Sequence, residues 1–492
     1  MSAASATSPA NDPTSLPADR NAARQPPGLQ LLFFTEMWER FSYYGMRALL
    51  VLYLVNAVGF SRADALQIYA IYTGLVWLSP LLGGIIADRW LGYRKAILIG
   101  GIVMAAGHFA MAFPGMLNLG LGLIIFGNGF FKANIASLLG TLYTDKDPRR
   151  DGGFTIFYMG INLGGFIGPL IAGSLGEGIG WHWGFASAGV GMCLGLAQFV
   201  RGQAKLGDAG LPPGKTRLER SDWLQVLLIS AAAVPLVYGV LTAWPLVAPL
   251  WSAIPVWLRI GVPLAATIAF LINVRATSSE QDWQQVYAVI ICSVFAIAFW
   301  MAFEQAGGTM NLFADKQVDR HLFGWEIPAS IFQSINSLCI FALAPLIAML
   351  WVRLDRSRFA MGAVMKMALG LLTVGLSFAV LAYAQSLAVK FGTVSPLWLV
   401  AVYLLQTIGE LFLSPVGMSM VTKLSPARYT GLLMGVWYCA IAIASYMAGT
   451  LENTLADSGI PVFTFLIGSS VAAGVLLILM RPLLSRWMHG KA

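Results

Sequence analysis

Long apolar runs alternate with short polar connections along nearly the whole chain. A membrane-spanning helix needs about 20 mostly apolar residues, and about fourteen runs of that length follow one another in this sequence. They lie at about 31–56, 65–87, 95–113, 117–140, 154–176, 183–201, 223–243, 252–273, 285–306, 328–352, 359–383, 396–420, 429–450 and 462–484. The pattern predicts an all-α polytopic membrane protein.

Composition supports this prediction. Hydrophobic residues make up 58% of the 492 positions and charged residues only 11%, whereas an average soluble domain carries about 25% charged residues. So little charge excludes a water-soluble protein of this length. The four cysteines stand singly inside apolar runs, without the spacing of a zinc site or a disulfide framework. We therefore expect no metal site and no cofactor.

The formal net charge of +8 comes from basic residues placed at every second connection, such as Arg94 and Lys95, or Arg149 and Arg150. The intervening connections, such as 386–395, are poor in charge. Short cytoplasmic loops of membrane proteins are rich in Lys and Arg. This distribution indicates a protein of the cell (inner) membrane with both termini in the cytoplasm, and it gives no reason to expect a nucleic acid partner.

The runs divide into six, two and six, which suggests a major facilitator fold in which two six-helix bundles rock about a central site. The extra pair, joined by a short apolar connector at 245–251, is predicted to be a lateral hairpin without chemistry. We expect the protein to function as a monomer. The predicted segments are a disordered cytosolic tail (1–29), the N-terminal bundle (30–203), a linker with the two extra helices (204–284), the C-terminal bundle (285–485) and a cytosolic tail (486–492).

The first run carries a polar stripe. A charge at the centre of a membrane helix costs about 2.5–3.5 kcal/mol on insertion scales, so such residues need a reason to be there. At about 100° per residue, one helical face holds Glu36, Glu39, Arg40, Tyr43, Tyr44 and Arg47. We expect these side chains to pair with one another and to face a water-filled cavity. The alternative is an ion-paired stripe that only locks helices together.

Lys132, Glu304 and Glu410 each stand as the only charge within an apolar run. Each is expected to find a partner of opposite sign across the cavity, as a functional pair or as a static salt bridge between helices.

The fifth run combines polar residues with a line of glycines. Tyr158 and Asn162 are one turn apart, and Gly160, Gly164 and Gly168 recur at the spacing that lets helices approach closely. Asn162, and likewise Asn336 in a later run, can serve as a bond between helices or as a contact to a substrate amide. The sequence leaves these two roles open.

Several of these residues form recognisable strings. Glu36-x-x-Glu39-Arg40-Phe41-x-Tyr43-Tyr44-Gly45 resembles the ExxERFxYYG motif of the proton-dependent oligopeptide transporter (POT) family, bacterial type. Phe157-Tyr158-x-x-Ile161-Asn162-x-Gly164 resembles the second signature of the family. The resemblance covers residues of about 30–485. It implies a proton-coupled symporter that imports di- and tripeptides by alternating access, driven by the proton gradient.

The resemblance also implies roles for individual residues. Positions matching substrate contacts are Arg40 and Lys132 (peptide carboxylate), Glu410 with Asn336 (peptide amino group), Asn162 and Tyr44 (peptide backbone), and Trp300 and Trp437 (walls of side-chain pockets). Positions matching proton coupling and gating are Glu36, Glu39, Arg40, Arg47 and Glu304, with Arg47 and Glu304 as the pair that closes the outer gate. Further pocket positions, with roles left open, are Tyr72, Trp77, Tyr158 and Ser414.

Trp77 departs from the tyrosine that many bacterial members carry, so the preferred peptides stay open. Another small solute, such as a drug, nitrate or a peptide-like compound, is an alternative substrate, although nitrate-type relatives tend to lack the first-helix motif. A membrane-embedded enzyme or a substrate sensor is a further alternative. The sequence contains no Ser/His/Asp set, HExxH motif or phosphate loop, so we expect no catalytic residues and no enzyme.

Overall fold

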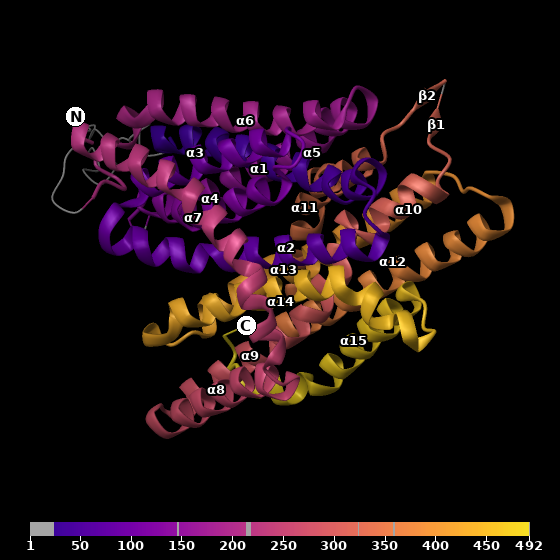
Figure 1. The fold of residues 1–492 in the computed structure, drawn as a ribbon. Helices are drawn as coiled ribbons and strands as arrows, with labels where there is room; N and C mark the ends of the chain where they lie inside the picture. The colour runs from indigo at the N-terminus through magenta and orange to yellow at the C-terminus, as the bar shows by residue number, and fades with distance from the viewer. Residues whose placement is uncertain (1–23, 145–146, 213–217, 323, 358–359, 492) are drawn as a thin grey trace, which may run out of the picture.

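The computed structural model describes residues 24–144, 147–212, 218–322, 324–357 and 360–491, and it is almost entirely helical (Figure 1). Within these ranges, thirteen helices are long and apolar enough to cross a membrane. A shorter apolar stretch, Leu264–Thr277, adds to them. The predicted all-α membrane architecture is confirmed. Of the predicted tail at 1–29, residues 1–23 lie outside the described residues.

The N-terminal half contains six long helices and three short helical turns. The long helices are α1 (Pro27–Tyr53), α2 (Arg62–Ile86), α3 (Tyr93–Met111), α4 (Leu117–Gly140), α5 (Arg150–Gly178) and α6 (Trp181–Gly202). Single π-helical turns extend α1 (Leu54–Val58) and α2 (Ala87–Leu91), and a 3₁₀ turn follows α6 (Gln203–Leu206). Glycines with positive φ end both π turns, Gly59 and Gly92, as expected where the chain must leave a helix sharply.

The C-terminal half repeats this plan with more irregular structure on one side. Its helices are α9 (Glu280–Phe303), α10 (Thr309–Gln317), α11 (Ser334–Asp355), α12 (Ala363–Phe391), α13 (Leu397–Leu424), α14 (Thr430–Leu455) and α15 (Val462–Trp487). Short 3₁₀ turns lie at Glu304–Gly307, Ala329–Gln333, Ala427–Tyr429 and Ala456–Ser458. Between α10 and α11, β1 (His321–Leu322) pairs antiparallel with β2 (Trp325–Glu326), with His321 opposite Glu326.

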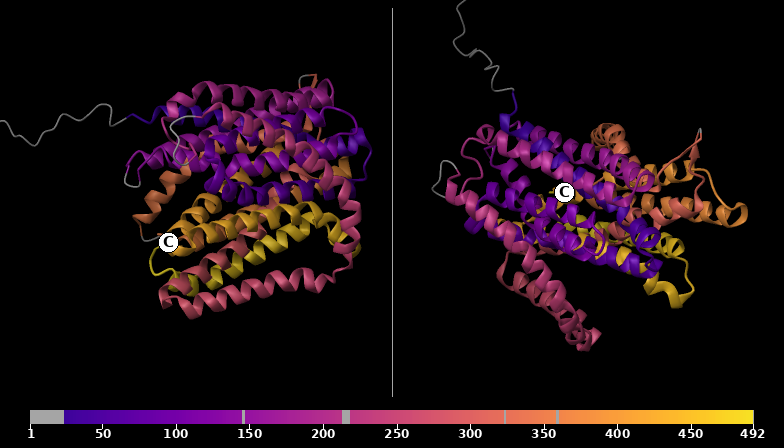
Figure 2. Two further views of the ribbon diagram at one scale, coloured as in Figure 1. Left: turned by 60° about the vertical axis from the view of Figure 1, so that its left-hand side comes forward. Right: turned by 45° about the horizontal axis from the view of Figure 1, so that its top comes forward.

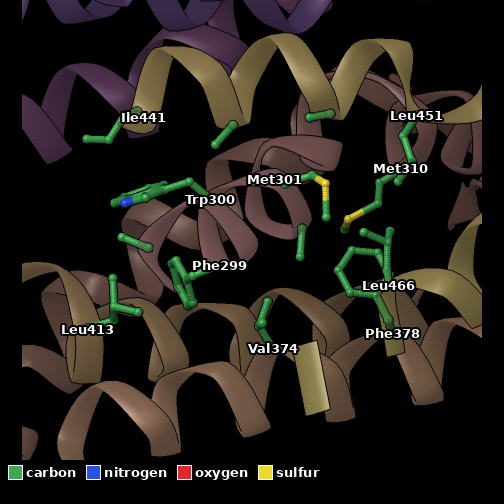
Figure 3. Packing of buried hydrophobic residues seen from close by; sticks show 14 of the residues in the cluster. Phe299, Trp300, Met301, Met310, Val374, Phe378, Leu413, Ile441, Leu451 and Leu466 are labelled. Atoms are coloured by element: carbon green, nitrogen blue, oxygen red, sulfur yellow. The ribbon is translucent and has the colours of Figure 1, made fainter. Parts of the chain in front are cut away.

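The two halves lie against each other, the first above the second in Figure 1. They meet along two helix pairs, α2 with α14 and α5 with α11. One apolar core stays within the N-terminal half and α7. The other fills the C-terminal half, part of which is seen in Figure 3, and continues into the end of α1 and the start of α2. The apolar contact between the halves is therefore concentrated at the end of the molecule where α1 finishes and α2 begins.

Polar contacts between the halves gather at the same end, which we call the closed end. There the Asn311 amide donates to the Ala48 carbonyl (2.7 Å), Arg62 pairs with Glu452 (2.6 Å) and the Asn453 amide donates to the backbone of the second helix. Helix α1 runs toward this end, so the prediction of cytoplasmic termini would place it on the extracellular side; that orientation stays a prediction.

The two extra helices, α7 (Arg220–Ala253) and α8 (Val256–Thr277), form the predicted lateral hairpin, but their junction differs from the prediction. Helix α7 continues through 245–251, and the connector is only Ile254–Pro255. Helix α7 packs on α3 and α4, whereas α8 packs on α9. The legs diverge, so that α7 descends from the first half to α8 beneath the second half (Figures 1 and 2).

Several helices are longer than the apolar runs that predicted them. Helix α1 begins at Pro27, inside the predicted tail, and α12 continues to Phe391 rather than ending near 383, which shortens the predicted connection at 386–395. At the C-terminal end, His489 and Lys491 hydrogen-bond to Gln284 and Gln285 at the start of α9. Hydropathy marks only the apolar part of a helix, and polar turns at its ends escape it.

Candidate functional site

The polar stripe of α1 forms a compact buried cluster. The Arg40 guanidinium makes a two-pronged contact with Glu39, with Nε 2.5 Å from Oε2 and Nη2 2.6 Å from Oε1. The same Nε lies 3.6 Å from Glu36 Oε1, one turn earlier. The guanidinium also lies over the Tyr43 ring, 4.8 Å from its centroid. The predicted pairing within the stripe is confirmed for these three charged residues.

Lys132 of α4 joins this cluster. Its Nζ donates to Glu36 Oε1 at 2.8 Å, so that one carboxylate oxygen faces both Lys132 and Arg40. The expected partner of opposite sign is thus present. The Lys132 side chain is 23% exposed, whereas Glu36 and Glu39 are fully buried. Lys132 is thus the most exposed charged residue of this cluster.

Glycines of α5 allow α1 to come this close. A Cβ at Gly160 would lie 2.8 Å from the Phe33 carbonyl, and one at Gly168 would lie 2.6 Å from the Phe41 carbonyl. At Gly164 a Cβ would collide with the backbone of Met37. The predicted packing role of this glycine line is confirmed. Asn162, on the same helix, donates to the Tyr158 carbonyl (3.0 Å) within α5, and among the described residues its amide donates to no neighbouring helix.

Arg47, two turns beyond Arg40, connects the halves instead of pairing within the stripe. Its Nη2 donates to Glu304 Oε2 at 2.6 Å and its Nε to the Tyr69 hydroxyl at 2.8 Å, all in buried surroundings. Helix α9 ends at Phe303, and the following 3₁₀ turn carries Glu304. The Arg47–Glu304 pair implied by the family resemblance is therefore present, at the closed end of the molecule. Its role as a gate stays a prediction.

Glu410 of α13 has a different environment. Its Oε2 accepts a hydrogen bond from the Asn336 amide of α11 (2.9 Å), which also donates to Thr407 (3.1 Å). Among the residues that the structure describes, no cation pairs with Glu410, so the expectation of an opposite charge is wrong for this residue. One amide donor occupies only part of the hydrogen-bonding capacity of the carboxylate. The carboxylate also lies within electrostatic range of the Tyr44 and Tyr158 hydroxyls of the other half.

The positions with open roles are spread over both halves. Tyr44 and Ser414 are half-buried, and Tyr158 is 38% exposed. The Trp77 ring stacks on Tyr438 of α14, 6.5 Å apart and nearly parallel. The Tyr72 hydroxyl is buried and has no hydrogen-bond partner in the described part of the chain.

Two tryptophans predicted to line pockets are packed into the core of the C-terminal half. Trp437 is fully buried against Gly417, where a Cβ would collide with the ring. Trp300 makes edge contacts with Phe299 and Phe303 and lies beside Ile441 (Figure 3). Their role as pocket walls stays a prediction.

Tyr69, Tyr438 and Glu177 were missed by sequence reasoning. Tyr69 precedes Trp77 by eight residues on α2, and this helical spacing was a usable signal. Tyr438 directly follows Trp437 and carries no signal of its own. Glu177 accepts hydrogen bonds from the backbone N–H groups of Ala329 and Ser330 in the other half. It stands near the end of an apolar run, where an acid usually means no more than a helix terminus.

Comparison with known proteins agrees with the geometry. The model of the POT family matches residues 94–465. The chain is 37% identical to the peptide transporter YePEPT of Yersinia enterocolitica over 96% of this chain and 97% of that protein. It is 34% identical to a di-/tripeptide transporter of Lactococcus lactis over 94% and 96% of the two chains.

A crystal structure of a peptide transporter POT in complex with sulfate superposes on the fold with a TM-score of 0.80. It is 36% identical and the match covers 95% of this chain and 96% of that one. The six-plus-six arrangement with two central helices thus has a solved counterpart of similar sequence. The chain is a member of the POT family of transporters.

Proposed function

We propose that the protein is a proton-coupled symporter that imports di- and tripeptides across the cell (inner) membrane as a monomer, with both termini in the cytoplasm. The observation that carries the proposal is a division of charge between the halves. The cations Arg40 and Lys132 of the N-terminal half stand in one cluster, where they pair with Glu39 and Glu36, whereas Glu410 of the C-terminal half has an amide but no cation beside it within the described residues. The relatives named as peptide and di-/tripeptide transporters support the substrate class.

A short peptide is a zwitterion that fits this division. Its carboxylate needs a cation, and its ammonium needs a carboxylate that is not already paired with one. Lys132 offers the accessible cation and Glu410 the acid. Half-exposed aromatic side chains such as Tyr44 and Tyr158 accept varied peptide side chains without demanding specific hydrogen bonds.

Proton coupling follows from the crowded charges on α1. Glu36 bonds to Lys132 and lies near Arg40, and its second oxygen, Oε2, has no hydrogen-bond partner in the described ranges. A proton on Glu36 removes the negative charge that holds Lys132. The lysine is then free to bind a peptide carboxylate, so that proton binding and peptide binding favour each other.

At the outer gate, protonation of an acid again weakens an ion pair. Arg47 and Glu304 join the halves at the closed end, and a proton on Glu304 replaces the bond between two charged groups by a weaker one. The halves then separate more easily on that side. The inward membrane potential, about 2.3 kcal/mol per charge per 100 mV, drives the proton and hence the cycle.

The test is uptake of labelled dialanine and trialanine into liposomes that contain the purified protein. Uptake is measured with an imposed inward proton gradient, without it, and with a protonophore. Concentrative uptake only with the gradient supports the proposal. If neither peptide enters under any of these conditions, while another small solute does, the peptide assignment is wrong.

Two substitutions sharpen this test. Arg40→Ala and Lys132→Ala are expected to reduce dipeptide uptake at least about tenfold, because each removes a charged hydrogen-bond donor worth about 1.5–3 kcal/mol. Lys366→Ala is the matched control, since Lys366 bonds only to Asp355 within the C-terminal half among the described polar side chains. Wild-type uptake in Arg40→Ala or Lys132→Ala would remove that residue from the carboxylate site.

A further inference from the structure

The seam between α5 and the start of α11 consists of small residues facing one another across the two halves. Ser334 Oγ donates to the Phe166 carbonyl at 2.8 Å. Ser330 lies so close to Gly173 that a Cβ there would collide with its hydroxyl, and a Cβ at Gly165 would lie 2.6 Å from Ser337 Oγ. Side chains this small interlock very little, so this seam can separate and close again without repacking.

Glu177 lies at the closed end of this seam and accepts three hydrogen bonds across it. Its Oε2 accepts from the Ala329 backbone N–H at 2.8 Å. Its Oε1 accepts from the Ser330 backbone N–H at 3.0 Å and from the Ser330 hydroxyl at 2.5 Å. The side chain is only 13% exposed. One carboxylate of the N-terminal half therefore takes three hydrogen bonds from the C-terminal half.

The donors stand at the start of a long helix. Ala329–Gln333 is a 3₁₀ turn that runs directly into α11, and the span Ala329–Asp355 is 27 residues long. The first N–H groups of a helix have no partner within it and carry partial positive charge. Glu177 supplies the missing acceptors from the opposite half. Arg320 adds a weaker attraction, with Nη1 3.9 Å from Glu177 Oε2.

This contact mirrors the Arg47–Glu304 pair. In that pair the acid belongs to the C-terminal half and its donor to the N-terminal half; at Glu177 the acid and donors are exchanged. The two contacts use different helices, α1 with the turn after α9 and α5 with the turn before α11. They share no residue among their described hydrogen bonds.

We infer that Glu177 is a second latch of the outer gate, which holds the closed end together independently of Arg47 and Glu304 and must release the start of α11 each time that end opens. It acts as a positioning residue and does not contact substrate. The inference rests on the proposed alternating-access function, but its test needs no peptide. It can therefore fail without affecting the substrate assignment.

The experiment measures the distance between the halves at the closed end. Spin labels are placed on Cys substituted for Phe113, 60% exposed after α3, and for Phe391, 74% exposed at the end of α12. The four native cysteines are first replaced by Ser or Ala. Pulsed electron paramagnetic resonance of the protein in liposomes, without substrate, then gives the ratio of long to short distances between the two spin labels.

Glu177→Gln is expected to raise that ratio about fivefold or more, the shift that corresponds to losing about one net hydrogen bond. Ser330→Ala, which removes only the hydroxyl donor, should give a smaller shift in the same direction. Asp319→Asn is the matched control: it also neutralises an acid at this end, but among the described residues its side chain bonds only to His321 of the same loop.

Two results would overturn the inference. One is an unchanged ratio in both Glu177→Gln and Ser330→Ala. The other is an equal shift in Asp319→Asn, which would mean that the closed end responds to surface charge in general and not to this contact. If Glu177→Gln fails to fold, Ser330→Ala and Asp319→Asn still decide between these outcomes.

Discussion

Glu410 shows what can and cannot be predicted for a single residue. Its burial in a membrane helix was evident from the apolar residues around it, because charges are costly there. The residue pattern did not indicate its partner, since Asn336 lies 74 positions away and an amide carries no signal of opposite charge; only the family resemblance placed Asn336 near Glu410. Only the fold reveals that the acid is held by one amide rather than by a cation.

Glu410 is predicted to receive the peptide ammonium. Dipeptides with an acetylated amino end should compete at least about tenfold more weakly than free dipeptides, because a charged hydrogen bond of about 1.5–3 kcal/mol is lost. In Glu410→Gln this difference should largely disappear, which competition against labelled dialanine would measure. Equal competition by free and acetylated dipeptides in the unchanged protein would show that Glu410 has another role.

Trp77 is predicted to shape one side-chain pocket. It stacks on Tyr438, and the smaller ring in Trp77→Tyr would leave space beside that contact. We expect the variant to gain relative affinity, about two- to fivefold, for dipeptides with large side chains while keeping its dependence on the proton gradient. A competition series from Ala-Ala to Phe-Phe measures this. An unchanged order of preference would indicate that the tryptophan only packs between helices.

At the scale of elements, α5 has glycines on two faces. One face packs on α1 within its own half, and the other meets serines of α11 and of the turn Ala329–Gln333 before it, across the halves. The spacing of Gly160, Gly164 and Gly168 was enough to predict a close helix contact, because small residues four apart line one face. The second face could not be predicted, since its serines become neighbours only when the halves come together.

The first face yields a stability prediction. Gly164→Ala places a methyl group against the backbone of Met37, which cannot move aside as a side chain does. We expect a loss of about 1–3 kcal/mol, typical of overpacking, seen as a lower thermal unfolding temperature in detergent. Gly178→Ala on the same helix, with open space around its Cβ position, is the matched control. Equal unfolding temperatures for the two variants would contradict the packing role.

Helix limits were the least accurate part of the prediction. The expected connector at 245–251 belongs to α7. This helix has 34 residues and is longer than one membrane crossing requires. Similarly, α12 extends eight residues beyond position 383. Hydropathy reports where lipid could surround a helix, and backbone hydrogen bonds continue the helix beyond that region.

At the scale of the whole molecule, the structure is closed at one end. The count of spans and the six-two-six plan could be predicted from the apolar runs, and the Arg47–Glu304 pair could be predicted through the family resemblance. Which end is closed could not, because Arg47–Glu304, Arg62–Glu452 and Asn311 with Ala48 are contacts between distant parts of the chain. Their balance against contacts at the other end decides the state.

Glu304 is predicted to couple the gate to the proton. Glu304→Gln mimics the protonated acid in size and neutrality, so Arg47 should no longer hold the closed end in a proton-dependent way. We expect the variant to lose accumulation of dipeptide under a proton gradient and to keep peptide-for-peptide exchange in counterflow, since exchange needs only binding and movement of the halves. Both are measured on one liposome preparation.

The two assays separate the outcomes. Accumulation that persists in Glu304→Gln would contradict the coupling role. Loss of both activities would favour the alternative in which Glu304 merely holds the halves together. Asp319→Asn provides the control for a changed acid at the same end, because its bonds to His321 stay within one loop.

The lateral hairpin has a consequence for how the chain could be divided. Helix α7 is fixed to the first half by a buried pair, Lys95 Nζ to Asp222 (3.0 Å), and by Val226 and Ala233 in the core. Helix α8 is fixed to the second half, where the Tyr287 hydroxyl donates to the Leu271 carbonyl. Each leg thus belongs to the bundle beside it, and only two residues join them. Two polypeptides, 1–254 and 255–492, made together in one cell, should therefore assemble into a working carrier, whereas a cut before Arg220 would remove α7 from the bundle on which it folds.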